Sequence, residues 1–407
     1  MRTTTDAESD AEYDILTTAA GLALLAEVGE TPRPGPADLH RWRKAAPAGF
    51  VAAAWRLADG RRRGAAKFTR AASMWFEPTA LEQATAEPVA RHKARRFAGG
   101  AVVDLCCGLG GDTLALANVA TQVVAVDLDR GMARRALWNA GVHGVSDRVA
   151  AVRARAESFA LPPGALVHVD PDRRARSTAP RSKALAGYVP GLAFLGELVR
   201  SGRGGALKLG PASDFDAHFS APELGVEIEL VSLGGECKEA TAWFGPLANC
   251  RRRATCLPDG SSWTDRDGPT GQPAPVAGIA AWVYDPDPAL VRSGLLDGFA
   301  TAHGLSRAGS DLDVLTSPAR VDSPFLTAFA VDEVLPLDLK RLRRRVAERR
   351  LGPLEIKTRG LDLRPEAVRH LLRPEGSEPA TLLLLGGHEP SRAIFARRVP
   401  PVRPVCS

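Results

Sequence analysis

The chain has 407 residues, of which 45% are hydrophobic and 25% charged, and its formal net charge is +6. This length predicts two or three domains, and the composition is ordinary for a globular protein. No run of about 18 apolar residues predicts a membrane span, and the acidic N-terminal stretch differs from the cationic start of a secretory signal, so we expect a cytoplasmic protein.

The first 95 residues predict a helical region. Apolar residues recur at helical spacing in residues 16–28, 50–57 and 81–89. Clusters of Pro and Gly at 32–36 and 60–64 separate these segments. We therefore expect several helices joined by short turns before the first strand.

The next region, residues 96–256, alternates short apolar runs with helical patterns, which is typical of a parallel α/β sheet. The stretch 257–275 is rich in Pro, Gly, Asp and Ser and predicts a linker or long loop. Residues 276–407 form a third region, for which we expect strands near 280–284, 326–331, 354–357 and 381–385, with helices between them.

A glycine-rich turn follows the first strand of the central region. Gly108, Gly110 and Gly111 let the backbone turn tightly beyond the carboxyl end of that strand, where ligands of open α/β sheets bind. A dinucleotide fingerprint would need glycine where Thr113 stands. Acids before and after the turn would repel a pyrophosphate but attract the ammonium and sulfonium of S-adenosylmethionine. The predicted cofactor site contains Asp104, Cys106, Gly108, Gly110 and Asp112.

Two further acids extend this predicted site. Asp127 ends the next strand, 122–127, where a carboxylate can accept hydrogen bonds from both ribose hydroxyls. The alternative is that Asp127 caps the following helix. Glu157 follows the third strand, in a position to contact the adenine.

The ordered series DLCCGLGGD, VDLD and an acidic third segment resembles the class I S-adenosylmethionine-dependent methyltransferases. The resemblance extends over residues 97–256. It implies an α/β fold with a Rossmann-like, seven-stranded sheet and S-adenosylmethionine as the cofactor.

In that family the loop after the fourth strand faces the transferred methyl group. Here the strand 165–169 is followed by Asp170-Pro171-Asp172-Arg173-Arg174. Members that methylate amines carry Asp or Asn, two prolines and an aromatic, so this chain departs from the pattern at Asp172 and Arg173. We predict catalytic roles for Asp170, Pro171 and Asp172, and phosphate contacts for Arg173 and Arg174. The alternative is an exposed turn.

Two lysines are further candidates for substrate contact. Lys208 lies in a predicted fifth strand, and Lys238 in a polar segment after a later strand. Neighbouring Cys237 could be the nucleophile of a carbon-5 pyrimidine methylation, although an inert thiol is the favoured interpretation. The six cysteines form no CxxC pair, and we expect reduced thiols and no metal.

Positive charge gathers between residues 340 and 373, where twelve Lys and Arg face four acids. Clustering of this kind favours a phosphate-bearing partner. Leu339, Leu342 and Val346 form one helical stripe, with arginines on the other faces.

The pattern GPLEIKTRG, LRPEAVRHLL and ATLLLLGG resembles a THUMP-like C-terminal domain, which is found attached to bacterial and archaeal methyltransferases. The upstream LEQATAEPVARHKARRF is similar to their helical lead-in. THUMP domains generally deliver RNA to modifying enzymes, so the resemblance implies an RNA substrate. Arg343, Arg344 and Lys357 are the expected contacts.

We predict a methyltransferase that acts on RNA, either tRNA or rRNA. Two alternatives stay open: a small-molecule or protein methyltransferase, and an RNA-binding protein that has lost turnover. The sequence leaves the oligomeric state open.

Overall fold

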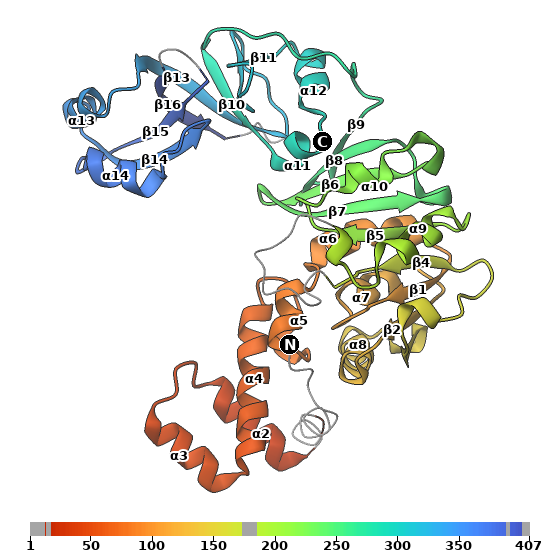
Figure 1. Ribbon diagram of the computed structural model, residues 1–407. Helices are drawn as coiled ribbons and strands as arrows, with labels where there is room; N and C mark the ends of the chain where they lie inside the picture. Colours follow the sequence, from red (N-terminus) through yellow and green to blue (C-terminus); the bar gives the residue numbers. More distant parts are fainter. Residues whose placement is uncertain (1–12, 14–17, 173–184, 388–390, 401–407) are drawn as a thin grey trace, which may run out of the picture. The chain divides into compact units, whose positions relative to one another are not determined.

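A computed structural model describes Tyr13 and residues 18–172, 185–387 and 391–400 (Figure 1). The predicted phosphate contacts Arg173 and Arg174 lie outside these residues. The chain forms two compact units. The first contains residues 1–226 and 241–249, and the second contains residues 227–240 and 250–407.

The N-terminal region is helical, as predicted. Helices α2 (Ala19–Gly29), α3 (Pro36–Ala45) and α4 (Ala48–Gly64) enclose an apolar cluster that includes Val28, Trp42 and Leu57. The pattern at 81–89 predicts a single helix, but the structure has α5 (Pro78–Gln83) and α6 (Glu87–Ala94). Pro88 explains the break, because a proline has no N–H to donate to the carbonyl of Ala84 four residues earlier and its ring would clash with that carbonyl, so it is tolerated only in the first turn of α6.

The first sheet has nine strands in the order β3-β2-β1-β4-β5-β7-β6-β8-β9. The first five in sequence are β1 (Ala101–Leu105), β2 (Gln122–Asp127), β3 (Val149–Arg153), β4 (Leu166–Val169) and β5 (Gly205–Leu209). They pair in parallel and alternate with α7 (Gly111–Ala117), α8 (Arg130–His143) and α9 (Leu192–Arg200), which confirms the α/β fold.

Four strands and one short helix complete this part of the chain. They are α10 (Phe215–Phe219), β6 (Glu227–Leu233), β7 (Glu236–Phe244), β8 (Arg252–Leu257) and β9 (Ser261–Thr264). The seven expected strands are thus extended by β8 and β9. Because β9 pairs with β8, the stretch 257–275 is not wholly a loop. Pro, Gly and Asp around these four residues hide the strand in the sequence.

The second sheet belongs to the second unit and has the order β11-β12-β10-β13-β16-β15-β14. Its strands are β10 (Trp282–Pro286), β11 (Ser306–Arg307), β12 (Leu315–Ser317), β13 (Leu326–Pro336), β14 (Leu351–Arg359), β15 (Glu378–Leu385) and β16 (Arg392–Val399). The helices are α11 (Pro288–Arg292), α12 (Leu296–Ala302), α13 (Leu339–Glu348) and α14 (Pro365–Leu372).

Helices α13 and α14 cover one face of this sheet. Leu342 and Val368 pack with Leu382 and Leu384 of β15, whereas the alternate residues Leu383 and Leu385 belong to a separate core cluster. This alternation places the two clusters on opposite faces. Among the residues described, no helix is long and apolar enough to cross a membrane.

Candidate functional site

A cavity of about 640 Å³ lies in the first unit, where β1, β2 and β4 end. This volume suits a small ligand or cofactor. Its walls come from the segments after these three strands, from the residues after β3 and from α5. Acidic side chains outnumber the three arginines around it. The acids are Glu77, Asp104, Asp112, Asp127, Asp129, Glu157, Asp170 and Asp172.

Asp127 is fixed by backbone groups on both sides. Its Oδ2 accepts from the Gly108 N–H at 2.9 Å, and its Oδ1 accepts from the Asp129 N–H at 2.8 Å. The helix α8 is capped by Asp129 rather than by Asp127, because Asp129 Oδ1 accepts from the first helical amides. Burial raises the pKa of Asp127 to about 6. Asp127 therefore faces the cavity with a preset orientation.

The glycines of the turn have different tasks. Gly108 has a φ of 53° and open space where a side chain would stand, and it lines the cavity. Gly110 has a φ of 84° but packs on α8, where an added Cβ would lie 3.0 Å from Ala136 Cα. It does not line the cavity. Gly110 is thus needed for close packing of the turn on α8, and its predicted cofactor contact stays a prediction.

Asp104 is buried beneath the cavity. Its Oδ1 lies 2.7 Å from His168 Nδ1 on the neighbouring β4, and its Oδ2 accepts from the Thr113 hydroxyl. The parallel register of β1 and β4 places Asp104 opposite His168. Both carboxylate oxygens are therefore engaged within the protein, and Asp104 supports the glycine turn from below.

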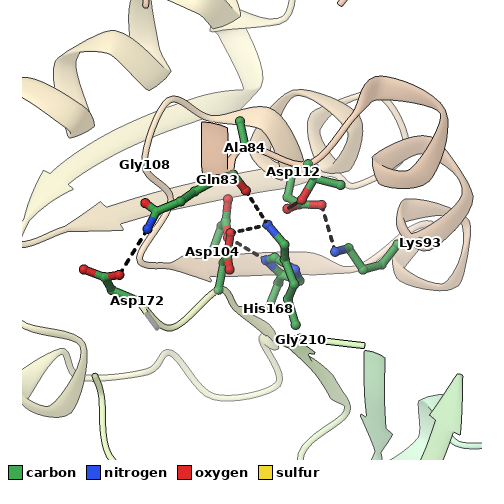
Figure 2. A network of polar contacts seen from close by, with 12 residues as sticks. Gln83, Ala84, Lys93, Asp104, Gly108, Asp112, His168, Asp172 and Gly210 are labelled. Carbon is green, nitrogen blue, oxygen red and sulfur yellow. Dashed lines mark hydrogen bonds and ion pairs between the residues drawn. The ribbon is translucent and has the colours of Figure 1, made fainter. Parts of the chain in front are cut away.

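Asp112 is the second buried acid of the turn. Its Oδ2 accepts from the Thr85 hydroxyl at 2.7 Å, and its Oδ1 lies 3.1 Å from Lys93 Nζ (Figure 2). Burial raises the pKa of this carboxyl, but Lys93 outweighs burial and holds the pKa well below its usual range. Asp112 thus joins the turn to the helices that precede the sheet.

Asp170 follows β4 and lines the cavity. Its Oδ2 lies 2.6 Å from Nζ of Lys208, which comes from β5 and also donates to the Gln83 carbonyl at 3.1 Å. Burial raises the pKa of Asp170, and the neighbouring Lys208 ammonium opposes that rise. Lys208 itself is 6% exposed and does not line the cavity, and its predicted substrate contact stays a prediction.

The other predicted residues of this unit lie at the cavity. Pro171 and Asp172 line it, and Asp172 Oδ1 accepts from Gln83 Nε2 at 3.3 Å (Figure 2). Cys106 lines it with a φ of 61°, an unusual conformation for a side chain with a Cβ, and burial raises the pKa of its thiol. Glu157 is exposed at the rim.

Lys238 and Cys237 do not line this cavity. Lys238 lies 2.6 Å from Glu236 at the exposed start of β7. Burial raises the pKa of Cys237 to about 12, which keeps the thiol protonated and disfavours a nucleophilic role.

The C-terminal cations divide into two groups. Arg343 and Arg344 are exposed on α13, with Arg344 Nε 3.5 Å from Glu348. Lys357 is half-buried on β14, with Nζ 2.8 Å from Asp285. Its charge is already compensated, which argues against the predicted phosphate contact.

The wall formed by residues 77–85 was not anticipated from the sequence. Glu77, Ala80 and Gln83 of this segment line the cavity together with Ala84 and Thr85. The sequence does give a helical pattern at 81–89 and the lead-in motif that begins at Leu81, but neither indicates that this segment lines a cavity. In the described ranges, no group of three or more candidate metal ligands gathers.

This chain is similar to known methyltransferases in sequence and in fold. The model of the RNA cap guanine-N2 methyltransferase family matches residues 99–177, and that of the THUMP domain-like family matches residues 326–398. The chain is 36% identical over 318 residues to an uncharacterized S-adenosylmethionine-dependent methyltransferase of Mycobacterium tuberculosis strain H37Rv. The alignment covers 77% of this chain and 85% of that protein, and the counterpart from strain CDC 1551 matches equally well.

Among solved structures, a putative methyltransferase from Porphyromonas gingivalis W83 has a similar fold. Its TM-score is 0.72 at 20% identity, with 93% of this chain and 98% of that chain covered. The similarity therefore includes both sheets. On these grounds the chain belongs to the S-adenosylmethionine-dependent methyltransferases, with a class I α/β fold and a THUMP-like domain near its C-terminal end.

Proposed function

We propose that this protein methylates RNA, either tRNA or rRNA, and that Asp170 holds the acceptor group. The observation that carries the proposal is the position of Asp170 at the cavity, with one carboxylate oxygen on Lys208. In the part of the chain that the structure describes, no hydrogen-bond donor reaches its other oxygen, Oδ1. That atom is available to a ligand.

The cavity fits the cofactor of the family. Its volume of about 640 Å³ and its acidic lining suit a molecule that carries an ammonium and a sulfonium. In this proposal Asp127, which lines the cavity and is oriented by the Gly108 N–H, accepts from the ribose hydroxyls, and Gly108 leaves room for a close backbone approach. When bound, S-adenosylmethionine supplies an activated methyl group on its sulfonium.

For this step the protein's contribution is positioning and proton removal. A carboxylate at Asp170 can accept a hydrogen bond from an acceptor N–H or O–H and align its lone pair with the methyl carbon. The bound cofactor would supply the methyl group, and the Asp170 carboxylate or water would take the proton that the acceptor loses. Pro171 and Asp172 shape the same wall.

The choice of RNA rests on the C-terminal domain and on the two family matches. Seven cations between residues 340 and 373 are exposed, with no acidic partner among the described residues. They are Lys340, Arg341, Arg343, Arg350, Arg364, Arg369 and Arg373. Exposed cations of this kind bind phosphates by releasing counterions.

The test is to incubate the protein with total bacterial RNA and S-adenosylmethionine labelled in the methyl group. The RNA is then digested and the labelled nucleoside identified. We expect label in one nucleoside of tRNA or rRNA, and much less of it with Asp170→Ala. Label confined to protein or to small molecules in a parallel lysate would contradict the RNA proposal and favour the other methyltransferase alternative.

A further inference from the structure

Three lysines that are distant in sequence gather around the break between α5 and α6. Lys67 Nζ donates to the carbonyls of Leu81, Glu82 and Ala84, at 2.8, 2.9 and 2.8 Å. Lys208 Nζ donates to the carbonyl between them, that of Gln83. Lys93 reaches the same segment through Asp112, which accepts from Thr85. We call residues 77–85 the cavity wall segment.

Lys208 differs from the other two because it also contacts Asp170. Its single ammonium joins the last carbonyl of α5 to Asp170 Oδ2 at 2.6 Å. The Gln83 side chain closes this link from the other direction by donating to Asp172 Oδ1. The wall segment and the loop after β4 are thus held by one cation and one amide (Figure 2).

We propose that Lys208 is a positioning residue for methyl transfer, which keeps Asp170 ionised and locks the cavity wall segment onto the loop 170–172. The inference rests on the proposed function of Asp170, and it needs no direct contact between Lys208 and the substrate.

The charges around Asp170 support this role. Lys208 faces it from β5, Lys93 from α6 and Asp112 from α7, and the Cys106 thiol lies nearby after β1. Asp112 is already neutralised by Lys93. Among the residues that the structure describes, Lys208 is the cation in direct contact with Asp170, and it lowers the pKa of Asp170 against the effect of burial, which by itself would keep the carboxyl protonated to higher pH.

The test compares Lys208→Met with Lys67→Met, since both lysines hold the wall segment but only Lys208 touches Asp170. The assay follows methyl transfer to total bacterial RNA at saturating S-adenosylmethionine from pH 5 to 9. We expect Lys208→Met to lower kcat by about 10-fold to 100-fold and to move the acidic limb of the pH profile up by about one unit or more. Lys208→Arg should recover most of the activity, whereas Lys67→Met should leave the acidic limb in place.

A second measurement does not depend on the RNA substrate. In Lys208→Met the carboxyl of Asp170 is buried without its cation, so the free energy of unfolding should fall as the pH rises from 5 to 8. Adding Asp170→Asn should remove this dependence. An unchanged acidic limb in Lys208→Met, or the same pH dependence of stability with and without Asp170→Asn, would overturn the role of Lys208. Failure of the wild-type protein to label any RNA would instead overturn the proposed function. The stability comparison would still show whether Lys208 neutralises Asp170.

Discussion

The cofactor cavity and the surface of α13 and α14 are both rich in charge, but they use it differently. At the cavity, Asp112 and Asp170 each have a lysine partner, and both lysines are buried. On α13 the side chains of Lys340, Arg341 and Arg343 are exposed and have no acidic partner in the described ranges. Charge in the first region fixes geometry, whereas charge in the second remains available to a partner.

The largest effect is expected from the carboxylate at the centre of the first region. Asp170→Ala should lower the rate of methyl transfer by about 100-fold to 10,000-fold, because without this carboxylate the acceptor is neither held nor deprotonated. The affinity for S-adenosylmethionine, measured by calorimetry, should stay close to that of the wild type. Undiminished turnover would show that the loop 170–172 is only a turn.

The second prediction concerns buried pairing. Lys93→Met leaves Asp112 without its cation, and we expect the free energy of unfolding to fall by about 3–5 kcal/mol. The matched control is Arg91→Met on the same helix, where the pair with Glu87 has an exposed arginine and a change within about 1 kcal/mol is expected.

This prediction has a pH dependence with a definite sign. Because the pKa of Asp112 in the folded protein is below its unfolded value, the pair stabilises the protein fully above about pH 4 and loses this effect as the pH falls further. The difference between wild type and Lys93→Met should therefore shrink below pH 4. A difference that grew in acid would contradict the pairing.

The third prediction addresses the cofactor. Asp127→Ala should weaken S-adenosylmethionine binding by about 1–3 kcal/mol, since the variant lacks a charged hydrogen-bond acceptor. With a pKa of about 6, wild-type Asp127 becomes protonated below that pH, so the affinity should decline between pH 7 and pH 5. Calorimetry across this range measures both effects, and Glu157→Gln at the exposed rim should change the affinity less.

The smallest effect is expected from the exposed cations of α13. It tests most directly whether unpaired cations, rather than paired ones, bind RNA. RNA affinity falls as salt rises, and the slope of log affinity against log salt concentration measures the number of phosphates neutralised. In the triple variant Lys340→Ala, Arg341→Ala and Arg343→Ala, this slope should become shallower by roughly 0.7–0.9 for each phosphate that is no longer neutralised. The matched control is the triple variant Arg345→Ala, Arg349→Ala and Lys357→Ala, which removes cations that already pair with acids. It should change the salt dependence of RNA binding less. Equal effects of the two triple variants would mean that ion pairing with acids does not determine which cations bind RNA.

The sequence predicted the α/β fold and the positions of most cavity acids. These acids follow directly after apolar strands, and the carboxyl ends of parallel strands lie at one edge of the sheet. It did not predict that Gly110 packs against Ala136, since a glycine needed for packing looks the same in a sequence as one needed for a ligand. Strand β16 was not predicted, because its arginines interrupt the alternating pattern. The partners of Asp104, Asp112 and Lys208 come from distant segments, and spacing along the chain carries no information about them.

The hydrogen bond between Gln83 and Lys208 joins residues 125 positions apart. Closing such a long loop costs conformational entropy, and the bond can form only after β5 has joined the sheet. A chain that began at residue 96 would contain every strand of that sheet, yet it would lack both Lys93 and the cavity wall. Cofactor binding therefore reports on the assembly of the first unit as a whole, and S-adenosylmethionine should raise its thermal stability as ligand concentration increases.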